Sequence, residues 1–178
     1  MSFVSIQRGY MKLERLNKVH FEALYKFEMS NKDWFEQFVP PRPDSYGSLL
    51  GFQSATNQLL LEQERGESYF FIGSVDDSII VRANLADVNS GNADVGYRVS
   101  SSATGEGYAT QALNQLVEFA RNQINLSQLS AKTTSNNQAS IKVLEKVGFT
   151  QVQRDSSTFL LNGESVTFIH FTLNLAEC

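Results

Sequence analysis

The order of the elements predicted along the chain favours an α/β (mixed α+β) fold, built on a mixed sheet with one parallel step near its centre. Three short runs of β-branched or aromatic residues follow one another at 68–75, 78–85 and 93–99, as the strands of an antiparallel meander do. The pattern then changes to helix, strand and helix, the crossover that two parallel strands need. The tail, residues 149–175, adds two more strand-like runs.

The N-terminal part predicts one strand and two helices. Residues 9–16 alternate apolar and polar side chains, as a half-buried strand does. From about Val19 to Met29 the apolar residues recur at helical spacing, and a stretch with three prolines ends that region. A second helix is expected from Ser45 to Arg65, because Gly66 follows it as a stop signal.

The second half predicts two helices on either side of one strand. Apolar residues three and four positions apart mark one face of a helix that opens at Gly105. A strand is expected from Gln128 to Thr134. The next helix, from about Asn136 to Val147, ends at Gly148, the residue type that best accepts a left-handed cap. In the tail, Asn162-Gly163 joins the two strand-like runs as a hairpin turn.

Length and composition favour a single domain over residues 1–178 and exclude several classes of protein. The chain is 42% hydrophobic and 11% aromatic, which is enough apolar surface for one ordered core. No apolar stretch approaches the roughly 20 residues that span a bilayer, and the start, Met1 to Arg8, lacks the pattern of a secretory signal. We therefore expect a cytoplasmic location. The formal net charge of −4, without a lysine or arginine cluster, argues against nucleic-acid binding.

The cysteine and histidine content argues against a bound metal. Cys178 is the single cysteine, so the chain can form neither an internal disulfide nor a thiolate cluster. His20 and His170 lie far apart, and neither has a second histidine or a cysteine at ligand spacing. We expect no metal.

The segment that says most about chemistry is the glycine-bearing turn at residues 104–110, Thr-Gly-Glu-Gly-Tyr-Ala-Thr, between a strand and an amphipathic helix. Its glycines let the backbone approach an anion closely. The unpaired N–H groups and the dipole at the start of the helix then favour a diphosphate. Taken alone, a tight turn without any ligand explains these glycines equally well.

Two other phosphate-binding motifs do not fit. A P-loop needs a Gly-Lys pair, and none occurs in the chain. A dinucleotide fingerprint needs glycine or alanine where Thr110 stands, and an acidic residue about 20 positions later. No aspartate or glutamate occurs between Glu118 and Glu145, so a nucleotide-dependent oxidoreductase is disfavoured.

Several elements, in the right order, resemble the GNAT superfamily of N-acetyltransferases. The segment Gly105 to Thr110 resembles the acyl-CoA loop of that superfamily. Asn137 to Ser140 and Val143 to Phe149 resemble the Asn-x-x-Ser and Leu-Glu-Lys-x-Gly-Phe elements of its RimJ/RimL type, the ribosomal-protein N-terminal acetyltransferases. Upstream, residues 31–46 are similar to the segment between the first helices of that group, and Asp94 to Val99 resembles its fourth strand.

This resemblance implies the GNAT fold, a central, mostly antiparallel sheet of about seven strands flanked by helices and splayed between strands 4 and 5. The pantetheine arm of acetyl-CoA would lie in the splay, with Ser140 near its sulfur. The residues implied to bind the coenzyme are Val99, Thr104, Gly105, Glu106, Gly107, Tyr108, Ala109, Thr110 and Asn137. Positions 137 and 140 share one helix face, which supports their pairing, although helix capping is an alternative role for Asn137.

The loop departs from the family pattern at two positions. Thr104 stands where arginine or glutamine is common, and Glu106 places a carboxylate where a neutral or basic residue is usual. A carboxylate beside a diphosphate weakens coenzyme binding by repulsion, which salt screens. The cations that could compensate for it are Arg98, Arg121, Lys132 and Lys142.

The resemblance implies direct attack of an uncharged primary amine on the thioester, with Ser140 as the proton donor to the departing thiolate. Asp94 is the candidate base, acting through water, and an ordinary surface carboxylate is the alternative. An α-amino group, with a reference pKa of about 7.7 to 8.0, needs less help from a base than a lysine side chain near 10.4.

We therefore expect the acceptor to be the N-terminal α-amine of a protein or peptide, of the ribosomal-protein kind. A small amine acceptor and a non-catalytic acyl-CoA-binding module remain the alternatives. Neither a membrane nor a nucleic acid is an expected partner, and the chain is expected to be a monomer or a homodimer.

Overall fold

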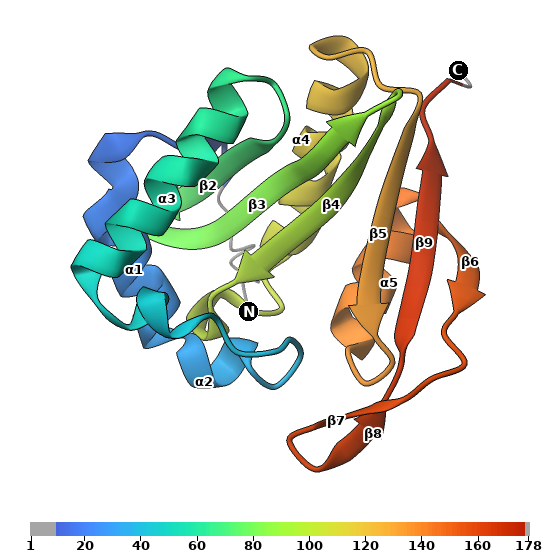
Figure 1. Ribbon diagram of the computed structural model, residues 1–178. Coiled ribbons are helices and arrows are strands. Elements are labelled where there is room, and N and C mark those ends of the chain that lie inside the picture. Colours follow the sequence, from blue (N-terminus) through green and yellow to red (C-terminus); the bar gives the residue numbers. More distant parts are fainter. Residues whose placement is uncertain (1–9, 177–178) are drawn as a thin grey trace, which may run out of the picture.

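The computed structural model describes residues 10–176, which form a twisted sheet with helices on both faces (Figure 1). The strands of the main sheet are β1 (Leu13–Arg15), β2 (Tyr69–Val75), β3 (Ser78–Asn89), β4 (Asn92–Val99), β5 (Gln128–Thr134), β6 (Thr150–Arg154) and β9 (Phe168–Asn174). Their order is β1-β2-β3-β4-β5-β9-β6, and every neighbouring pair is antiparallel except β4 with β5. This arrangement confirms the predicted fold class.

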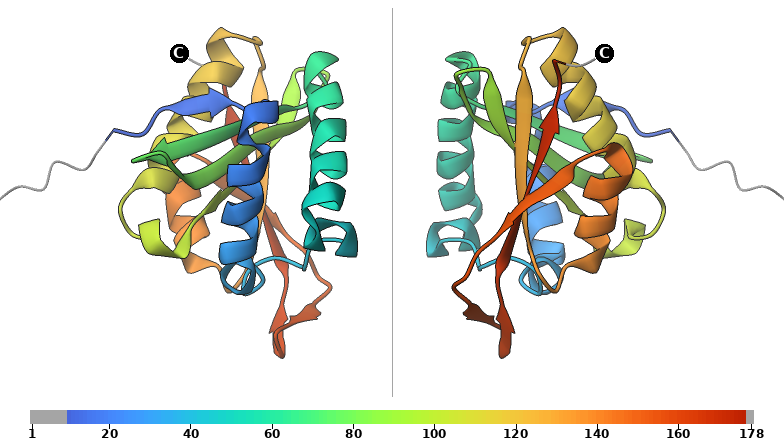
Figure 2. Two further views of the ribbon diagram at one scale, coloured as in Figure 1. Left: turned by 90° about the vertical axis from the view of Figure 1, so that its left-hand side faces the viewer. Right: turned by 90° about the vertical axis from the view of Figure 1, so that its right-hand side faces the viewer.

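Helices cover the sheet on two sides. They are α1 (Phe21–Ser30), α2 (Lys32–Phe35), α3 (Leu49–Glu64), α4 (Tyr108–Asn122) and α5 (Gln138–Val147), with short 3-10 turns at Lys18–His20, Asp44–Gly47 and Ser101–Ala103. Figures 1 and 2 show α1 and α3 on one face and α4 and α5 on the other. Within the described residues, no helix has both the length and the apolar character that a bilayer crossing requires.

Each face of the sheet has its own apolar core, because successive side chains of a strand point to opposite faces. On β2, Phe70 and Ile72 pack with Leu24 of α1 and Phe52 of α3. Phe71, between them in sequence, packs with the larger core under α4 and α5. Both helical layers therefore pack against the same sheet, and this packing holds the central strands of the sheet in place.

The two central parallel strands separate after a short paired stretch. β4 and β5 pair from Asn92 opposite Gln128 to Val95 opposite Ala131, and no pairing between them continues beyond that point. Both strands remain held on their outer sides, since β3 pairs with β4 as far as Val99 and β9 pairs with the whole of β5. The predicted splay between strands 4 and 5 is confirmed, and Figure 1 shows the gap widening toward α2.

Two helix starts differ from the prediction, each for a local reason. The helix expected from Ser45 begins at Leu49, because the hydroxyl of Ser48 accepts a hydrogen bond from the Gly51 N–H at 3.1 Å and caps it. The helix expected to open at Gly105 begins at Tyr108, since Gly105 and Gly107 adopt left-handed backbone angles.

The ends of the chain also differ from the prediction. Of the strand expected at residues 9–16, the structure contains Leu13–Arg15, and residue 9 lies outside the described residues. The tail contains four strands rather than two. The predicted turn at Asn162-Gly163 joins β7 (Phe159–Leu161) to β8 (Glu164–Val166), a separate two-stranded sheet, while β6 and β9 pair within the main sheet.

Candidate active site

A cavity of about 430 Å³ fills the splay on the side of α4 and α5, and we call it the glycine-loop cavity. Its wall is formed by the end of β4, the glycine turn, the first turn of α4, one side of α5, and α2 with the segment that follows it. The structure brings eight of the nine predicted coenzyme residues to this wall, all except Glu106. Ser140 lies on the same wall.

The glycine turn has the backbone geometry of an anion site. Gly105 and Gly107 have φ angles of +84° and +86°, which residues with a side chain rarely adopt. The first backbone bond of α4 runs from Gln111 N–H to the Gly107 carbonyl at 3.1 Å, so the preceding N–H groups have no partner inside the helix. These groups and the helix dipole suit the diphosphate of coenzyme A.

The two unusual residues of the loop differ in position, since Thr104 lines the glycine-loop cavity and Glu106 does not. The Thr104 hydroxyl donates to the Ser100 carbonyl at 3.1 Å, which stabilises the turn itself. The side chain of Glu106 is exposed and does not line the cavity. Of the four candidate compensating cations, Arg98 and Lys142 line the glycine-loop cavity, whereas Arg121 and Lys132 do not.

Two hydroxyl groups meet across the splay. The Tyr97 hydroxyl on β4 and the Ser140 hydroxyl on α5 are 3.0 Å apart, and either of them can be the donor. Burial raises the pKa of Tyr97 to about 12, an effect that the hydrogen bond with Ser140 partly opposes. Tyr97 therefore keeps its proton at neutral pH and can donate it to the Ser140 oxygen, which leaves the Ser140 proton available to another acceptor.

Asn137 takes the capping role that the sequence left as an alternative. Its side-chain oxygen accepts a hydrogen bond from the Ser140 N–H at 3.1 Å and so caps α5. The same side chain lines the glycine-loop cavity. One residue thus fixes the start of the helix and, through it, the position of Ser140.

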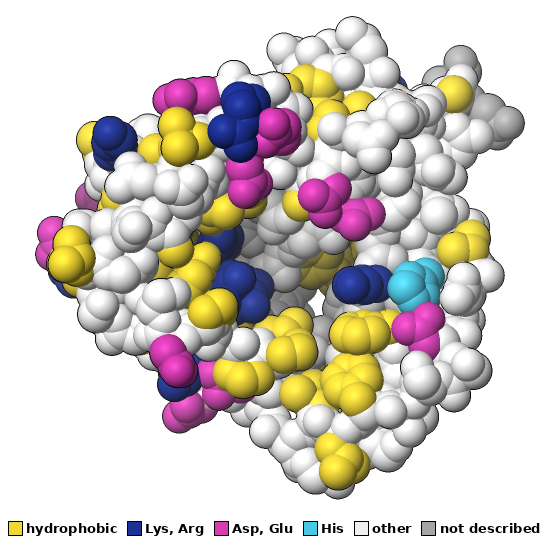
Figure 3. Space-filling model, viewed as in Figure 1, with side chains coloured by type: hydrophobic (Ala, Val, Ile, Leu, Met, Phe, Trp, Pro, Cys, Tyr) yellow, Lys and Arg dark blue, Asp and Glu magenta, His cyan; other side chains and the backbone are white. Residues whose placement is uncertain are grey.

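A second cavity, of about 530 Å³, opens on the opposite face of the sheet, and we call it the arginine cavity. It shares six wall residues with the glycine-loop cavity, among them Tyr97, Arg98 and Ser140. The two cavities therefore form one passage through the splay. Figure 3 shows this face hollowed at its centre, with lysine and arginine side chains on both sides of the hollow.

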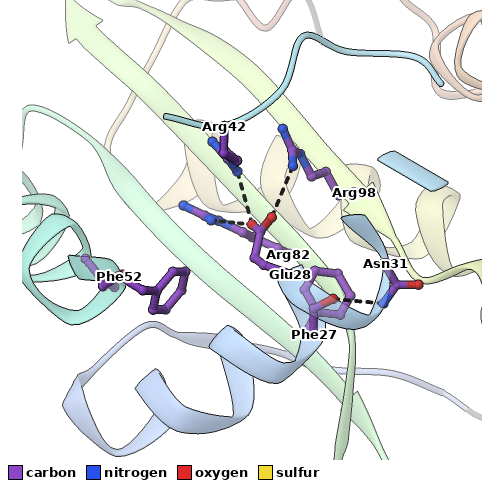
Figure 4. A network of polar contacts seen from close by, with 8 residues as sticks. Phe27, Glu28, Asn31, Arg42, Phe52, Arg82 and Arg98 are labelled. Atoms are coloured by element: carbon purple, nitrogen blue, oxygen red, sulfur yellow. Dashed lines mark hydrogen bonds and ion pairs between the residues drawn. The ribbon is translucent and has the colours of Figure 1, made fainter. Parts of the chain in front are cut away.

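Beside this passage, three arginines surround one buried carboxylate, that of Glu28 on α1, which is 2% exposed (Figure 4). Its Oε1 accepts from Arg42 Nη2 at 3.0 Å and from Arg82 Nη1 at 2.5 Å, and its Oε2 accepts from Arg98 Nη1 at 3.1 Å. Burial alone would raise the pKa of Glu28, but the three guanidinium groups outweigh that effect and hold it below its usual range. All three arginines line the arginine cavity.

The wall of the arginine cavity carries cations and no carboxylate. Lys132 of β5 is the fourth cation, with its Nζ 5.0 Å from the centre of the Phe168 ring. Burial lowers the pKa of Arg98 to about 10, and the repulsion from Arg42 adds to that shift. The interior of the passage is therefore electropositive on this side.

Asp94, the predicted base, lies apart from the two hydroxyl groups. It is exposed, in the paired part of β4, opposite Ala86 on one side and Ser130 on the other. It lines neither cavity, and two residues of strand, roughly 7 Å, separate it from Gly96 at the edge of the arginine cavity. Any proton transfer to Asp94 from the passage needs intervening water.

A strap across the wide end of the splay turns the gap into a passage. This strap is residues 36–43, between α2 and the 3-10 turn at Asp44–Gly47. Its carbonyl groups accept hydrogen bonds from the end of β5 and from the turn between β7 and β8. Thr134 Oγ1 donates to the Phe38 carbonyl at 3.1 Å, and Asn162 Nδ2 donates to the Glu36 carbonyl at 2.9 Å. Within residues 10–176, no group of three or more His, Cys, Asp or Glu side chains is placed to hold a metal ion.

Known proteins share both the sequence pattern and the fold. The chain is 30% identical over 127 residues to the probable N-acetyltransferase YjcK of Bacillus subtilis, covering 68% of this chain and 70% of YjcK. The ribosomal-protein-S5-alanine acetyltransferase of Vibrio fischeri superposes with a TM-score of 0.86 at 19% identity over 97% of each chain. RimL, a ribosomal L7/L12 α-N-protein acetyltransferase solved with coenzyme A, gives 0.84 at 20% identity, covering 94% of this chain and 96% of RimL.

These two structures establish a shared fold, and the glycine-loop cavity carries backbone N–H groups that suit the diphosphate of coenzyme A. The family model described as the acetyltransferase (GNAT) domain matches residues 11–150, which is most of the chain. The protein belongs to the GNAT acetyltransferases and is an acetyl-CoA-dependent acyltransferase.

Proposed function

We propose that this protein acetylates the N-terminal α-amino group of a protein or peptide, of the kind that ribosomal proteins present. The observation that carries the proposal is the passage through the splay, in which the glycine-loop cavity and the arginine cavity meet at Tyr97 and Ser140. The coenzyme enters from one face and the acceptor from the other, so that the amine reaches the thioester at the junction.

On the coenzyme side, the chain supplies backbone groups for binding. The N–H groups at the start of α4, from Tyr108 to Thr110, hold the diphosphate, and the unpaired end of β4 near Val99 bonds the pantetheine amides. Acetyl-CoA supplies the thioester whose carbonyl carbon the amine attacks. Backbone N–H groups at the same strand end stabilise the oxyanion that forms.

At the junction, Ser140 donates a hydrogen bond to the departing sulfur. Thiols have reference pKa values near 8.5, far below that of a serine hydroxyl, so the thiolate needs stabilisation in the transition state more than complete proton transfer. Tyr97, which stays protonated, donates to the Ser140 oxygen and strengthens that bond. Direct transfer in this form needs no acyl-enzyme intermediate.

On the acceptor side, the cations of the passage favour the neutral form of the amine, which reduces the need for a base. Positive charge near an amine disfavours its protonated form and lowers its pKa. An α-amine near 8 then becomes largely neutral at physiological pH, whereas a lysine side chain does not. The remaining proton leaves through water, with Asp94 as the proposed final acceptor.

The same charges weigh against one of the small-amine alternatives, a polyamine. A polyamine carries several positive charges, which repel the four cations of the arginine cavity. The other alternative is a non-catalytic acyl-CoA-binding module. It is supported by Thr104 and Glu106, the two residues at which the loop differs from the family pattern. The Thr104 hydroxyl bonds to the Ser100 carbonyl and the Glu106 side chain does not line the glycine-loop cavity, which weakens that support.

Thiol release from acetyl-CoA, measured with α-amino peptides, Nα-blocked lysine peptides and spermidine, tests the proposal. We expect the highest kcat/KM with free α-amines. A preference for spermidine would assign the protein to the small-amine group instead. Tight binding of acetyl-CoA without transfer to any of these amines would favour the non-catalytic module. The cytoplasmic location and the oligomeric state stay predictions from the sequence.

A further inference from the structure

The arginine cluster has more positive charge than its carboxylate neutralises. Three guanidinium groups share Glu28, so the buried cluster keeps two uncompensated charges, and Lys132 faces it from across the passage. Among the described residues, Glu28 is the only carboxylate within ion-pair distance of Arg42, Arg82 or Arg98. Glu36 and Asp44 line a smaller cavity beside Arg42 and Arg98 without pairing with them.

Hydrogen-bond donors are also in excess. A guanidinium group has five N–H donors, and Glu28 accepts one bond from each of the three arginines. The buried Nε of Arg42 has no acceptor among the described residues. A buried donor without a partner costs free energy, and an oxyanion bound at this site would remove that cost.

Aromatic rings fix the orientation of two of the three guanidinium groups, so that their N–H donors are set to bind an oxyanion. Arg98 stacks over the Phe35 ring with its Cζ 5.1 Å from the ring centre, and Arg42 stacks over Tyr46 at 5.2 Å. Stacking fixes the orientation of each fork before a ligand arrives, and a fixed guanidinium fork matches a carboxylate or phosphate. Arg98 also lines both cavities, so this site adjoins the junction where the amine reacts.

A purely structural role explains the cluster less well. One arginine would suffice to pair Glu28 and fasten α1 to the sheet. Two further, partly buried arginines add mutual repulsion and desolvation, which destabilise the free protein unless an anion offsets them.

We propose that Arg42, Arg82 and Arg98 form an anion subsite, which selects acceptors that carry a carboxylate close to the reacting amine. This proposal rests on the proposed function and names its substrate class. The carboxylate can come from an acidic side chain just behind the N-terminus of a peptide, or from the α-carboxylate of a free amino acid. Both sources present the same chemistry to the arginines.

The test is calorimetric binding of matched acceptors to the protein with coenzyme A present. Two hexapeptides with free N-termini differ only in having glutamate or glutamine at their second and third positions, and free glutamate is compared with glutamine amide. We expect the anionic member of at least one pair to bind about 10- to 100-fold tighter, the usual range for hydrogen bonds to a charged group. The preference should shrink at high salt.

Variants then locate the subsite. Arg42→Gln should bring the preference close to one, and Arg42→Lys, which keeps the charge but loses the fork, should reduce it in part. Lys26→Gln is the matched control, because it removes one charge from an exposed side chain on α1, outside both cavities, and should leave the preference unchanged. A preference that survives Arg42→Gln and Arg42→Lys at full size would overturn the assignment.

Failure of this inference and failure of the proposed function give different results. Equal binding of both members of each pair, or no binding of any of the four, would overturn the anion subsite. Acetylation of the glutamine peptide at a rate similar to the glutamate peptide would do so as well, while leaving α-amine acetylation intact. A preference seen only with free glutamate would support the subsite and reject the protein N-terminus as acceptor.

Discussion

The two halves of the passage are built in different ways. The glycine-loop cavity offers backbone N–H groups, and its proposed anion site comes from one continuous segment, residues 104–110. The arginine cavity is lined by side chains from the strap, β3, β4 and β5, and its arginines pair with Glu28 of α1; these elements meet only in the folded protein. Backbone groups suit the half that we propose binds a common coenzyme, whereas side chains can change acceptor preference without changing the fold.

The largest expected effect is on the rate of acetyl transfer, at the junction where the two cavities meet. Ser140→Ala should lower single-turnover acetyl transfer by about 10²- to 10⁴-fold, the usual contribution of a proton-donating group. Acetyl-CoA affinity should change little, because the hydroxyl acts mainly on the departing sulfur. The start of α5 should remain intact, since Asn137 bonds to the backbone N–H of this residue rather than to its side chain.

Ser140→Thr is the matched variant, because it restores a hydroxyl group, and we expect it to recover part of the rate. Full single-turnover activity in Ser140→Ala would remove this residue from the mechanism. Lost coenzyme binding with unchanged chemistry would instead assign Ser140 to the coenzyme side.

The second prediction concerns the stability of the arginine half. Glu28→Gln should reduce the free energy of unfolding by about 3 to 5 kcal/mol, because it leaves the buried Arg82 and the partly buried Arg42 and Arg98 without their shared anion. Glu22→Gln, on the exposed side of the same helix, should stay within about 0.5 kcal/mol of the parent. Urea unfolding of both variants measures the difference. Similar values for the two would show that the cluster contributes little to folding.

The same carboxylate predicts a dependence on pH. Because the arginines hold the pKa of Glu28 below its ordinary value of 4.5 in the folded state, its stabilisation is complete above that value. It is lost as the pH falls through the lower, folded-state pKa. The difference in free energy of unfolding between the parent and Glu28→Gln should therefore be constant near neutral pH and should shrink below about pH 4.5.

The sequence predicted the glycine-loop half far better than the arginine half. The strand from Gln128 to Thr134 has the predicted bounds, and Gly148 caps α5 in the left-handed conformation as expected, because these signals are local. Glu28 and Arg98 are 70 positions apart, and nothing near either residue indicates the other. Arg82 offered one signal, a charge inside an apolar strand, where a buried partner is needed.

Tyr97 shows the same limit at the junction. The residue stood in a segment that resembles the family, but its contact with Ser140 depends on how α5 packs across the splay. Strand alternation places it on the face of Val95 and Val99, toward α4 and α5, which the sequence could have indicated. The distance between the two hydroxyl groups could not be obtained from spacing alone.

A smaller effect is expected from Tyr97→Phe. It removes one hydrogen bond to the Ser140 oxygen, and a typical net value of 0.5 to 1.5 kcal/mol corresponds to a two- to tenfold loss of rate. If Tyr97 acts through Ser140, the double variant with Ser140→Ala should be no slower than Ser140→Ala alone. Additive losses would mean that the tyrosine contacts the reacting groups independently.

The smallest effect is expected at Glu106, where the sequence and the structure lead to different magnitudes. From the sequence, the carboxylate lies beside the diphosphate, and Glu106→Gly should tighten acetyl-CoA binding clearly. In the structure its side chain is exposed and does not line the glycine-loop cavity, so only screened repulsion acts through solvent. We therefore expect a gain of less than about threefold at low salt and none at high salt. Glu106→Gln is the better control, because it removes the charge without adding the backbone freedom of a third glycine. A gain of tenfold or more with Glu106→Gln would mean that the loop turns this carboxylate toward the coenzyme when it binds.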